Sequence, residues 1–274
     1  MRLRVTFVAA LAAVAAVTML LGGAASAAPG SMPTVRNGTG WSGYTTYITQ
    51  NAKGQPTSKE YYADSRWKVP KLDCNATRHP IIGANSAVAM WVGLGGVGTN
   101  DHPESGNLVQ AGVLSRCRGY RQTDVAVHQI KPPDSSSIAL DAKHPVKAGD
   151  SIEATVAWRS ARNYSLEIND FTQHWVWGKV YAVSFGNVLD SADYIVESPG
   201  TYQADFGSVT FHASNYRTVP PCAFTCPPSF LNEGYAFRFV GVTAFNRDLA
   251  NVGHISSPVS ADPGTFSVAW ARGF

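Results

Sequence analysis

Two polar side chains, Gln110 and Glu197, stand inside runs of apolar and small residues and are the first candidates for chemistry. Gln110 lies in the segment Asn107–Val113, and Glu197 ends the segment Ser191–Glu197. Such residues are seldom buried unless a partner satisfies them or a function uses them. A glutamate in a partly desolvated cleft can exchange a proton with water, whereas a glutamine cannot titrate but donates and accepts hydrogen bonds. The pair therefore offers one acid–base group and one neutral group that can stabilise charge.

Strands must position both groups. Alternation along a strand puts Gln110 and Gly112 on one face of the first segment, and Asp193 and Glu197 on one face of the second. Because Gly112 has no side chain, we expect open space beside the Gln110 amide that a substrate could enter. The two polar groups are 87 positions apart, so only a sheet that brings distant strands side by side can make them neighbours.

The remainder of the chain indicates an all-β protein. β-Branched and aromatic residues alternate with polar ones throughout, turn residues punctuate the runs, and no sustained helical period with caps is found. Many short strands with regular turns favour an antiparallel β-sandwich. The expected strands are Tyr44–Ile48, Tyr61–Trp67, Ala87–Val92, Leu108–Leu114, Ser151–Trp158, Ser165–Ile168, Trp175–Phe185, Tyr194–Glu197, Gly207–Ala213, Ala236–Phe245 and Thr265–Ala271.

The N-terminus has the pattern of an export signal. Arg2 and Arg4 precede an apolar stretch, Val5–Leu21, and the small residues Ala25–Ala27 form a cleavage site. We therefore predict a signal peptide over residues 1–27, a mobile N-terminus over 28–40 and a single β-sandwich domain over 41–274. The protein is expected to be secreted, with no membrane contact after signal removal, because no later segment is long and apolar enough to cross a bilayer.

Charge argues against a polyanionic partner. Loss of Arg2 and Arg4 with the signal lowers the formal charge from +3 to +1. A near-neutral secreted domain lacks the basic surface that binds nucleic acid. With 15% charged and 11% aromatic residues, the composition describes a compact extracellular protein, which we expect to be a monomer.

Four cysteines, Cys74, Cys117, Cys222 and Cys226, remain after export. An even count in an oxidising compartment favours two disulfides, for which three pairings are possible. Cys222 and Cys226 can close a tight loop, which would leave Cys74 with Cys117. A zinc site at Cys222 and Cys226 is the alternative, although no second pair of ligands lies nearby at the usual spacing.

The segments around Gln110 and Glu197 resemble the glutamic peptidases, secreted acid endopeptidases with a catalytic Gln and Glu. The resemblance preserves order from about Trp41 to Phe211 and rests on the segments Gly40–Tyr44, Trp91–Gly96, Asn107–Val113, Ser191–Glu197 and Ala204–Phe211.

This resemblance implies a concanavalin A-like sandwich of two large sheets with Gln110 and Glu197 at the floor of a cleft. Glu197 would take a proton from the water that attacks a peptide carbonyl and return it to the departing amine, while Gln110 would donate to the oxyanion. Trp41 and Trp91 would line the cleft as platforms for the polypeptide substrate. No metal or cofactor is implied.

The chain departs from the family pattern where cleft carboxylates are usual. Gly95 replaces an acidic residue, Gln129 and Lys131 replace a Glu and a Tyr, and Asp193 shortens a Glu. Less like-charge repulsion would lower the pKa of Glu197. We expect altered specificity and an optimum less acid than is typical of the family.

The sequence is also compatible with other functions. The same departures fit a secreted peptide- or glycan-binding sandwich that has lost catalysis. A glycoside hydrolase needs two carboxylates roughly 5 to 10 Å apart, but Asp193 and Glu197 would be about 13 Å apart along one strand. The glycine pattern Gly93–Gly98 lacks the βαβ context of a dinucleotide site. No local motif indicates a Ser-His-Asp triad, whose members can lie far apart in sequence.

Overall fold

The computed structural model describes residues 34–38, 40–47, 59–75, 86–96, 107–134, 136–160, 162–185, 191–199, 203–219, 229–230, 235–239, 254–255 and 264–270. All of them belong to one compact unit, Ser31–Phe274. The expected signal peptide, Cys222 and Cys226 lie outside the described residues. Within the described part no helix is found that has the length and apolar character of a membrane span.

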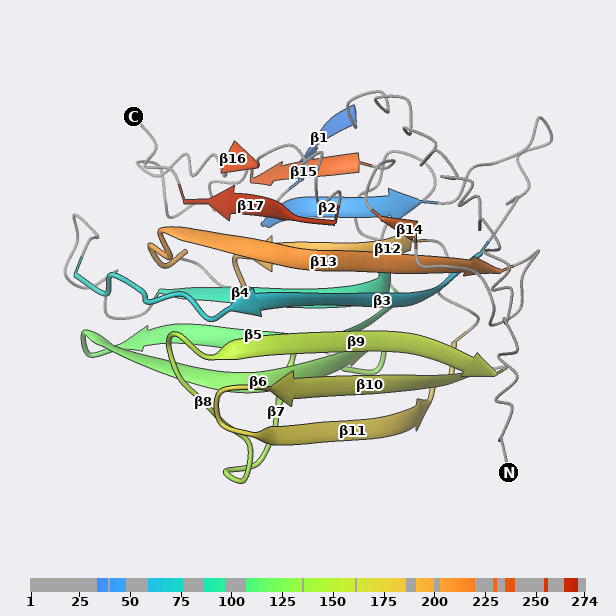
Figure 1. Cartoon of the computed structure of the whole chain (residues 1–274), viewed down its shortest axis with the longest axis horizontal. Helices are drawn as coiled ribbons and strands as arrows, with labels where there is room; N and C mark the ends of the chain where they lie inside the picture. Colours follow the sequence, from blue (N-terminus) through green and yellow to red (C-terminus); the bar gives the residue numbers. More distant parts are fainter. Residues whose placement is uncertain are drawn as a thin grey trace, which may run out of the picture. The chain divides into compact units, whose positions relative to one another are not determined.

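Two β-sheets form the described structure (Figure 1). The first sheet has the order β1 (Thr34–Gly38), β15 (Tyr235–Phe239), β2 (Trp41–Tyr47), β12 (Ser191–Glu197), β4 (Ala87–Gly95), β5 (Leu108–Arg118), β6 (Arg121–Lys131) and β7 (Ile138–Ala139), with β8 (Pro145–Val146) also paired to β6. The second has the order β11 (Trp175–Ala182), β10 (Asn163–Asp170), β9 (Ser151–Ser160), β3 (Lys59–Lys68), β13 (Ser208–Val219), β17 (Phe266–Ala269) and β16 (His254–Ile255), with β14 (Ser229–Phe230) paired to β13.

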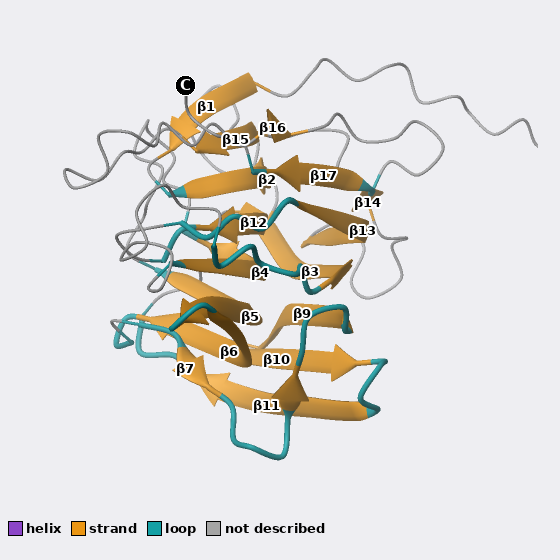
Figure 2. Cartoon of the chain, turned by 90° about the vertical axis from the view of Figure 1, so that its left-hand side faces the viewer, coloured by secondary structure: helices purple, strands orange, loops and turns teal. Residues whose placement is uncertain are grey.

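The predicted all-β antiparallel sandwich is confirmed. Figure 2 shows the two sheets as adjacent layers, and the one parallel pairing among the described strands is that of β1 with β15. Each expected strand corresponds to an observed one. Strand β6 was not expected, although it pairs with β5 along its whole length. Strand β1 lies within residues 28–40, whose mobility stays a prediction.

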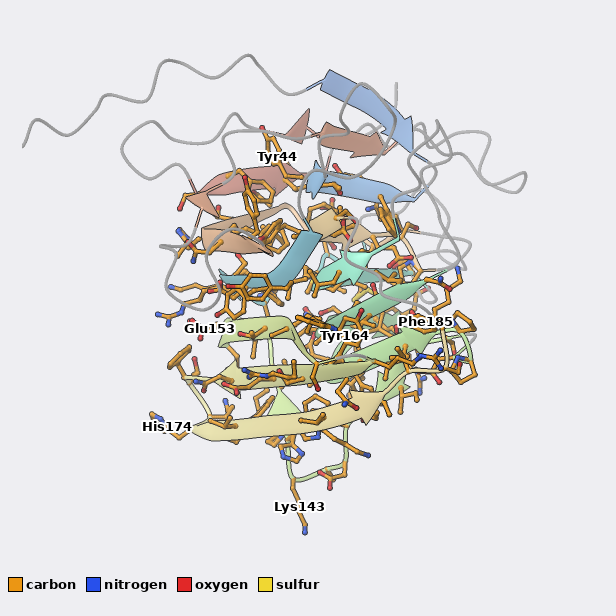
Figure 3. The ribbon with its side chains drawn as sticks, turned by 90° about the vertical axis from the view of Figure 1, so that its right-hand side faces the viewer. Tyr44, Lys143, Glu153, Tyr164, His174 and Phe185 are labelled. Carbon is orange, nitrogen blue, oxygen red and sulfur yellow. A yellow bond between two sulfur atoms is a disulfide. The ribbon has the colours of Figure 1, made fainter. Side chains whose placement is uncertain are left out.

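Large side chains fill the space between the sheets. Trp67 and Tyr164 are fully buried, and Figure 3 shows Tyr164 inside the body of the fold. Trp67 packs against Phe211 with ring centroids 5.4 Å apart, and Phe211 stacks on Phe266 at 5.0 Å. Burial of each such side chain typically contributes about 1.5–3 kcal/mol, so this layer holds the two sheets together.

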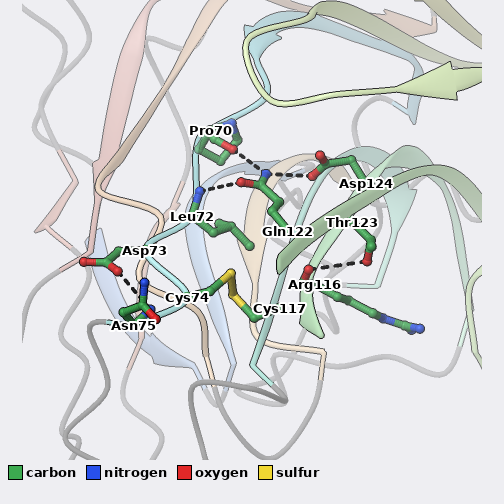
Figure 4. The surroundings of a disulfide bond; sticks show 10 residues. All are labelled: Pro70, Leu72, Asp73, Cys74, Asn75, Arg116, Cys117, Gln122, Thr123 and Asp124. Carbon is green, nitrogen blue, oxygen red and sulfur yellow. Dashed lines mark hydrogen bonds between the residues drawn. A yellow bond between two sulfur atoms is a disulfide. The ribbon is translucent and has the colours of Figure 1, made fainter. Parts of the chain in front are cut away.

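A disulfide joins Cys74, after β3, to Cys117 near the end of β5 (Figure 4). Beside it the Gln122 side chain accepts a hydrogen bond from the backbone of Leu72 at 2.7 Å and donates to the carbonyl of Pro70 at 2.8 Å. The bond is one of the pairings left open by the sequence. It fastens the end of β5 to the segment that leaves β3.

Candidate active site

The first sheet carries a second apolar cluster, separate from the core between the sheets. It contains Trp41 of β2, Trp91 of β4, Leu108 and Leu114 of β5 and Ile195 of β12. Their strand neighbours, such as Val109 and Val196, belong instead to the inter-sheet core. Because side chains alternate between faces, this cluster lies on the face of the first sheet that points away from the second sheet.

A cavity of about 260 Å³ opens over this face. Its lining comes from strands β2, β5, β6 and β12 and from residues that follow β4, β6 and β12: Trp41, Gly96, Leu108, Gln110, Leu114, Arg116, Gln129, Lys131, Ser136, Ser137, Glu197 and Pro199. Within the described residues, no group of three or more His, Cys, Asp or Glu side chains is arranged to hold a metal ion.

Gln110 and Glu197 both line this cavity. Gln110 on β5 pairs with Gly93 of β4, and Glu197 on β12 pairs with Ala89 of the same strand. Strand β4 therefore lies between the strands that carry them, which are about 10 Å apart across the sheet, and the four residues from Gly93 to Ala89 offset the two positions by about 13 Å along the strands. The sheet thus brings together two residues that are distant in the sequence.

Glu197 is held by the indole of Trp91. The indole Nε1 donates a hydrogen bond to Glu197 Oε2 at 2.7 Å, and the Trp91 ring meets Trp41 edge-on with centroids 4.9 Å apart. Trp41 lines the cavity, whereas Trp91 is 2% exposed and lies behind the carboxylate. A hydrogen-bond donor on a carboxylate favours the ionised form of that carboxylate. The Trp91 indole therefore stabilises the negative charge of Glu197 although it does not line the cavity itself.

Gln110 is 5% exposed and is oriented by a second amide. Its Nε2 donates to Gln129 Oε1 at 2.7 Å, and Gln129 Nε2 donates to the carbonyl of Asp134 at 3.3 Å. Gln110 Oε1 is buried and has no hydrogen-bond partner among the described residues. A buried carbonyl oxygen normally accepts a hydrogen bond. Gln110 Oε1 can therefore accept one from a donor in the cavity, such as a water molecule.

Gly112 does not provide the open space expected beside Gln110. A Cβ atom at this position would lie 2.0 Å from the carbonyl oxygen of Met90 and 2.7 Å from the Cα of Trp91. The missing side chain instead allows β5 and β4 to approach closely beneath the site. The expectation was wrong because it considered only the alternation of β5 and not the strand paired with it.

Asp193 is fully buried on β12 and is not among the residues that line the cavity. Its carboxyl accepts hydrogen bonds from Thr45 at 2.9 Å and Ser191 at 3.3 Å. Burial raises its pKa well above the ordinary value, and the two hydroxyls only partly oppose this. Glu197 is therefore the one carboxylate among the described lining residues, which removes support for the glycoside hydrolase alternative.

The sequence analysis did not predict several of the residues that line the cavity. Leu114 and Arg116 follow Gln110 at two-residue steps on the same face of β5, so continued alternation would have identified them. Gln129 and Lys131 were anticipated as cleft positions, and both line the cavity. Ser136 and Ser137 lie in a loop whose path had no local signal. Gly95 does not line the cavity, but its neighbour Gly96 does.

Both the sequence and the fold are similar to those of known proteins. The sequence profile of the peptidase A4 family matches residues 39–220. The fold is similar to a crystal structure of scytalido-glutamic peptidase with a transition state analog inhibitor, at 17% identity and a TM-score of 0.61, covering 85% of this chain and 98% of that one. It is also similar to SCP-B, a member of the eqolisin family solved with the tripeptide Ala-Ile-His, at 17% identity, a TM-score of 0.58 and the same coverage.

No curated protein sequence gives a significant match. The family match nevertheless spans most of the chain and includes Trp41, Trp91, Gln110 and Glu197. With the sandwich fold and the cavity over its first sheet, it establishes that the chain belongs to the peptidase A4 family, the glutamic peptidases, and is a hydrolase of peptide bonds.

Proposed function

We propose that the protein is a secreted endopeptidase that acts at acid pH through Glu197 and Gln110. The observation that carries the proposal is the shared cavity: its described lining contains one carboxylate, Glu197, and the amide of Gln110, whose carbonyl oxygen is buried without a described partner. The proposal includes removal of residues 1–27 as a signal peptide and a single catalytic domain over residues 41–274.

In the first step Glu197 acts as a general base. A water molecule between the two side chains donates one proton to the Glu197 carboxylate and attacks the carbonyl carbon of the scissile peptide bond. The Oε1 atom of Gln110 accepts the other water proton in a hydrogen bond and fixes the direction of attack. The Trp91 indole favours the ionised carboxylate that this step requires.

The second step breaks the C–N bond. Negative charge on the tetrahedral oxygen is stabilised by the Nε2 group of Gln110, which has two N–H donors and gives one to Gln129. Glu197 then returns its proton to the departing amine and becomes a carboxylate again. Proton and charge balance without a further group.

A polypeptide is the substrate class that the family implies. Trp41 lines the cavity, and its flat apolar ring is suited to contact with a substrate side chain. The tripeptide bound to SCP-B and the transition state analog bound to scytalido-glutamic peptidase support a peptide occupant on this fold.

A second candidate is a secreted binding protein that has lost catalysis. The replacement of a Glu by Gln129 and of a Tyr by Lys131 in the cavity supports it. The two candidates differ in one observable, which is whether the folded protein cleaves peptide bonds.

The test is hydrolysis of an acid-denatured protein between pH 2 and 7 by the mature wild type, Glu197→Gln and Gln110→Ala. We expect cleavage that survives pepstatin and a metal chelator. The Glu197 variant should lose about 10²–10⁴-fold and the Gln110 variant about 10²–10³-fold. A folded wild type without cleavage would overturn the proposal in favour of binding, and a maximum near pH 2 would contradict the milder optimum.

A further inference from the structure

The cavity carries two cations beside its one described carboxylate. Arg116 and Lys131, called here the flanking cations, both line it, and both are exposed. No described carboxylate forms a salt bridge with either of them, whereas Arg66 on the second sheet pairs with Glu153 at 2.8 Å. The side chains of the flanking cations are therefore exposed to solvent in the cleft, and their positive charges can pair with a ligand.

The register of β5 with β6 places Lys131 beside the amide pair. Gln129 lies opposite Gln110, and Lys131 lies opposite Leu108, one same-face step further along. The diagonal separation between the Cα atoms of Gln110 and Lys131 is therefore about 7–8 Å. Ser136 and Ser137 line the same cavity just after β6 and add hydroxyl donors at this end.

Arg116 flanks the other member of the pair. Glu197 lies at the level of Ala89, which pairs with Leu114 of β5. Arg116 is the next residue on the same face of β5, about 6.6 Å beyond Leu114. The Gln and Glu are therefore bracketed along the sheet, with Lys131 one step beyond Gln110 and Arg116 one step beyond the level of Glu197.

A positive cleft favours a negatively charged ligand, because low-dielectric walls strengthen the field inside it. Guanidinium and ammonium groups with nearby hydroxyls provide the donors that carboxylates accept. A ligand carboxylate bound at either cation would also lie at least one same-face residue step from Glu197, which limits the repulsion between the two negative charges. The arrangement therefore accepts carboxylates on both sides of the reacting groups and repels basic side chains there.

We infer that Arg116 and Lys131 are specificity-determining residues that select polypeptide segments with Asp or Glu flanking the cleaved bond. The inference rests on the proposed function and names its substrate class. It has a built-in pH dependence, because Asp and Glu side chains of an unfolded substrate carry charge only above about pH 4. Selection for acidic segments should be weak at pH 3 and strong at pH 5.

The first measurement maps cleavage sites by mass spectrometry in an unfolded protein mixture digested at pH 3 and pH 5. We expect Asp and Glu to be enriched next to the cleaved bond at pH 5 and not at pH 3. Two peptides that differ only in Glu or Gln at the enriched positions then give the ratio of their kcat/KM values. Exposed ion pairs contribute up to about five-fold each, so the ratio should be about 5–25 at pH 5.

The variants are Lys131→Gln, Arg116→Gln and the double substitution, with Lys143→Gln as the matched control. Lys143 is an exposed lysine that projects away from the body of the fold (Figure 3) and does not line the cavity. Each single variant should lower the Glu-to-Gln ratio about three- to five-fold, and the double variant should bring it near one. Lys143→Gln should keep the wild-type ratio. A ratio near one for the wild type at pH 5, or an unchanged ratio in the double variant, overturns the inference.

A binding measurement separates this result from failure of the peptidase proposal. If the wild type cleaves nothing, fluorescence anisotropy with the labelled Glu and Gln peptides at pH 5 replaces the kinetic ratio. If the wild type binds the Glu peptide more tightly than the Gln peptide, and the double variant does not, the selection of acidic segments by Arg116 and Lys131 is supported. The proposal that the protein is a peptidase would then fail independently. Equal affinities for the two peptides overturn it.

Discussion

At the scale of single residues, the hydrogen bond from Trp91 to Glu197 links a buried indole to the proposed base. In Trp91→Phe the ring against Trp41 is largely kept, but the donor is lost. Because hydrogen bonds to charged groups contribute about 1.5–3 kcal/mol, kcat/KM should fall about 10- to 150-fold. The donor favours the ionised carboxylate, so its loss should also move the acid limb of the pH–rate profile to higher pH. The measurement is kcat/KM from pH 2 to 7.

Trp67→Phe is the control for this substitution. Trp67 is another buried tryptophan, but it packs in the inter-sheet core and its indole nitrogen has no described acceptor. It should lower the melting temperature without moving the pH profile. If Trp91→Phe changed stability alone, as the control does, the Trp91 indole would have no part in the charge of Glu197.

Residue type identified Gln110 and Glu197 in the sequence, because polar groups in apolar strands need an explanation. Their partners were not predictable in the same way. The bond from Gln110 to Gln129 depends on the register between two strands and on side-chain rotamers. Neither is encoded in a local pattern.

At the scale of elements, Gly112 controls the approach of β5 to β4. Gly112→Ala would put a methyl group 2.0 Å from the carbonyl oxygen of Met90. Relief requires the strands to separate beneath the site, and overpacking of this kind typically costs about 1–3 kcal/mol. We expect a lower free energy of unfolding in urea and a loss of activity. Gly178→Ala on β11 is the matched control, since its nearest neighbour would be 3.9 Å away, and it should be nearly neutral. Equal effects of the two substitutions would refute the close approach.

The sequence was informative about strands with continuous apolar alternation and uninformative about β6. The first half of β6 is exposed or half-buried at Arg121–Val125, and its buried half begins only at Ala126. A polar start followed by an apolar end has no clear period. The turn before it uses Gly119 and Tyr120, both with positive φ, a geometry in which a tyrosine is unusual. The hairpin that completes the cavity was therefore not recognised as a hairpin.

At the scale of the whole molecule, buried titratable groups set the pH range of stability. Burial raises the pKa of Asp193, so the folded chain keeps a proton that the unfolded chain releases above about 3.8. The stability of the wild type should therefore decline as pH rises from that value toward the folded pKa. Asp193→Asn removes this decline. The two proteins should be similar below pH 3.8, and the variant should be more stable at pH 7 by about 1–3 kcal/mol. Urea unfolding at pH 3, 5 and 7 tests this, and a constant difference across pH would contradict it.

His128 acts in the opposite direction. It is buried between β6 and β11, stacks on Trp177 at 5.1 Å and shares a hydrogen bond with Tyr181 at 2.8 Å. Burial lowers its pKa, so protonation is harder in the fold, and this contribution to stability is lost as pH falls below 6.5. Asp193 therefore favours the acid range and His128 the neutral one.

The hairpin of β5 and β6 has a consequence for how mutation can change the cleft. Gln110, Arg116, Gln129 and Lys131 all belong to this one contiguous stretch of chain, whereas Glu197 belongs to β12. Mutations confined to this short stretch of the gene can therefore alter the charge of the cleft and leave Glu197, the proposed base, unchanged. Substitutions at Arg116 and Lys131 can therefore change the charge of the cleft while Gln110 and Glu197 are both kept.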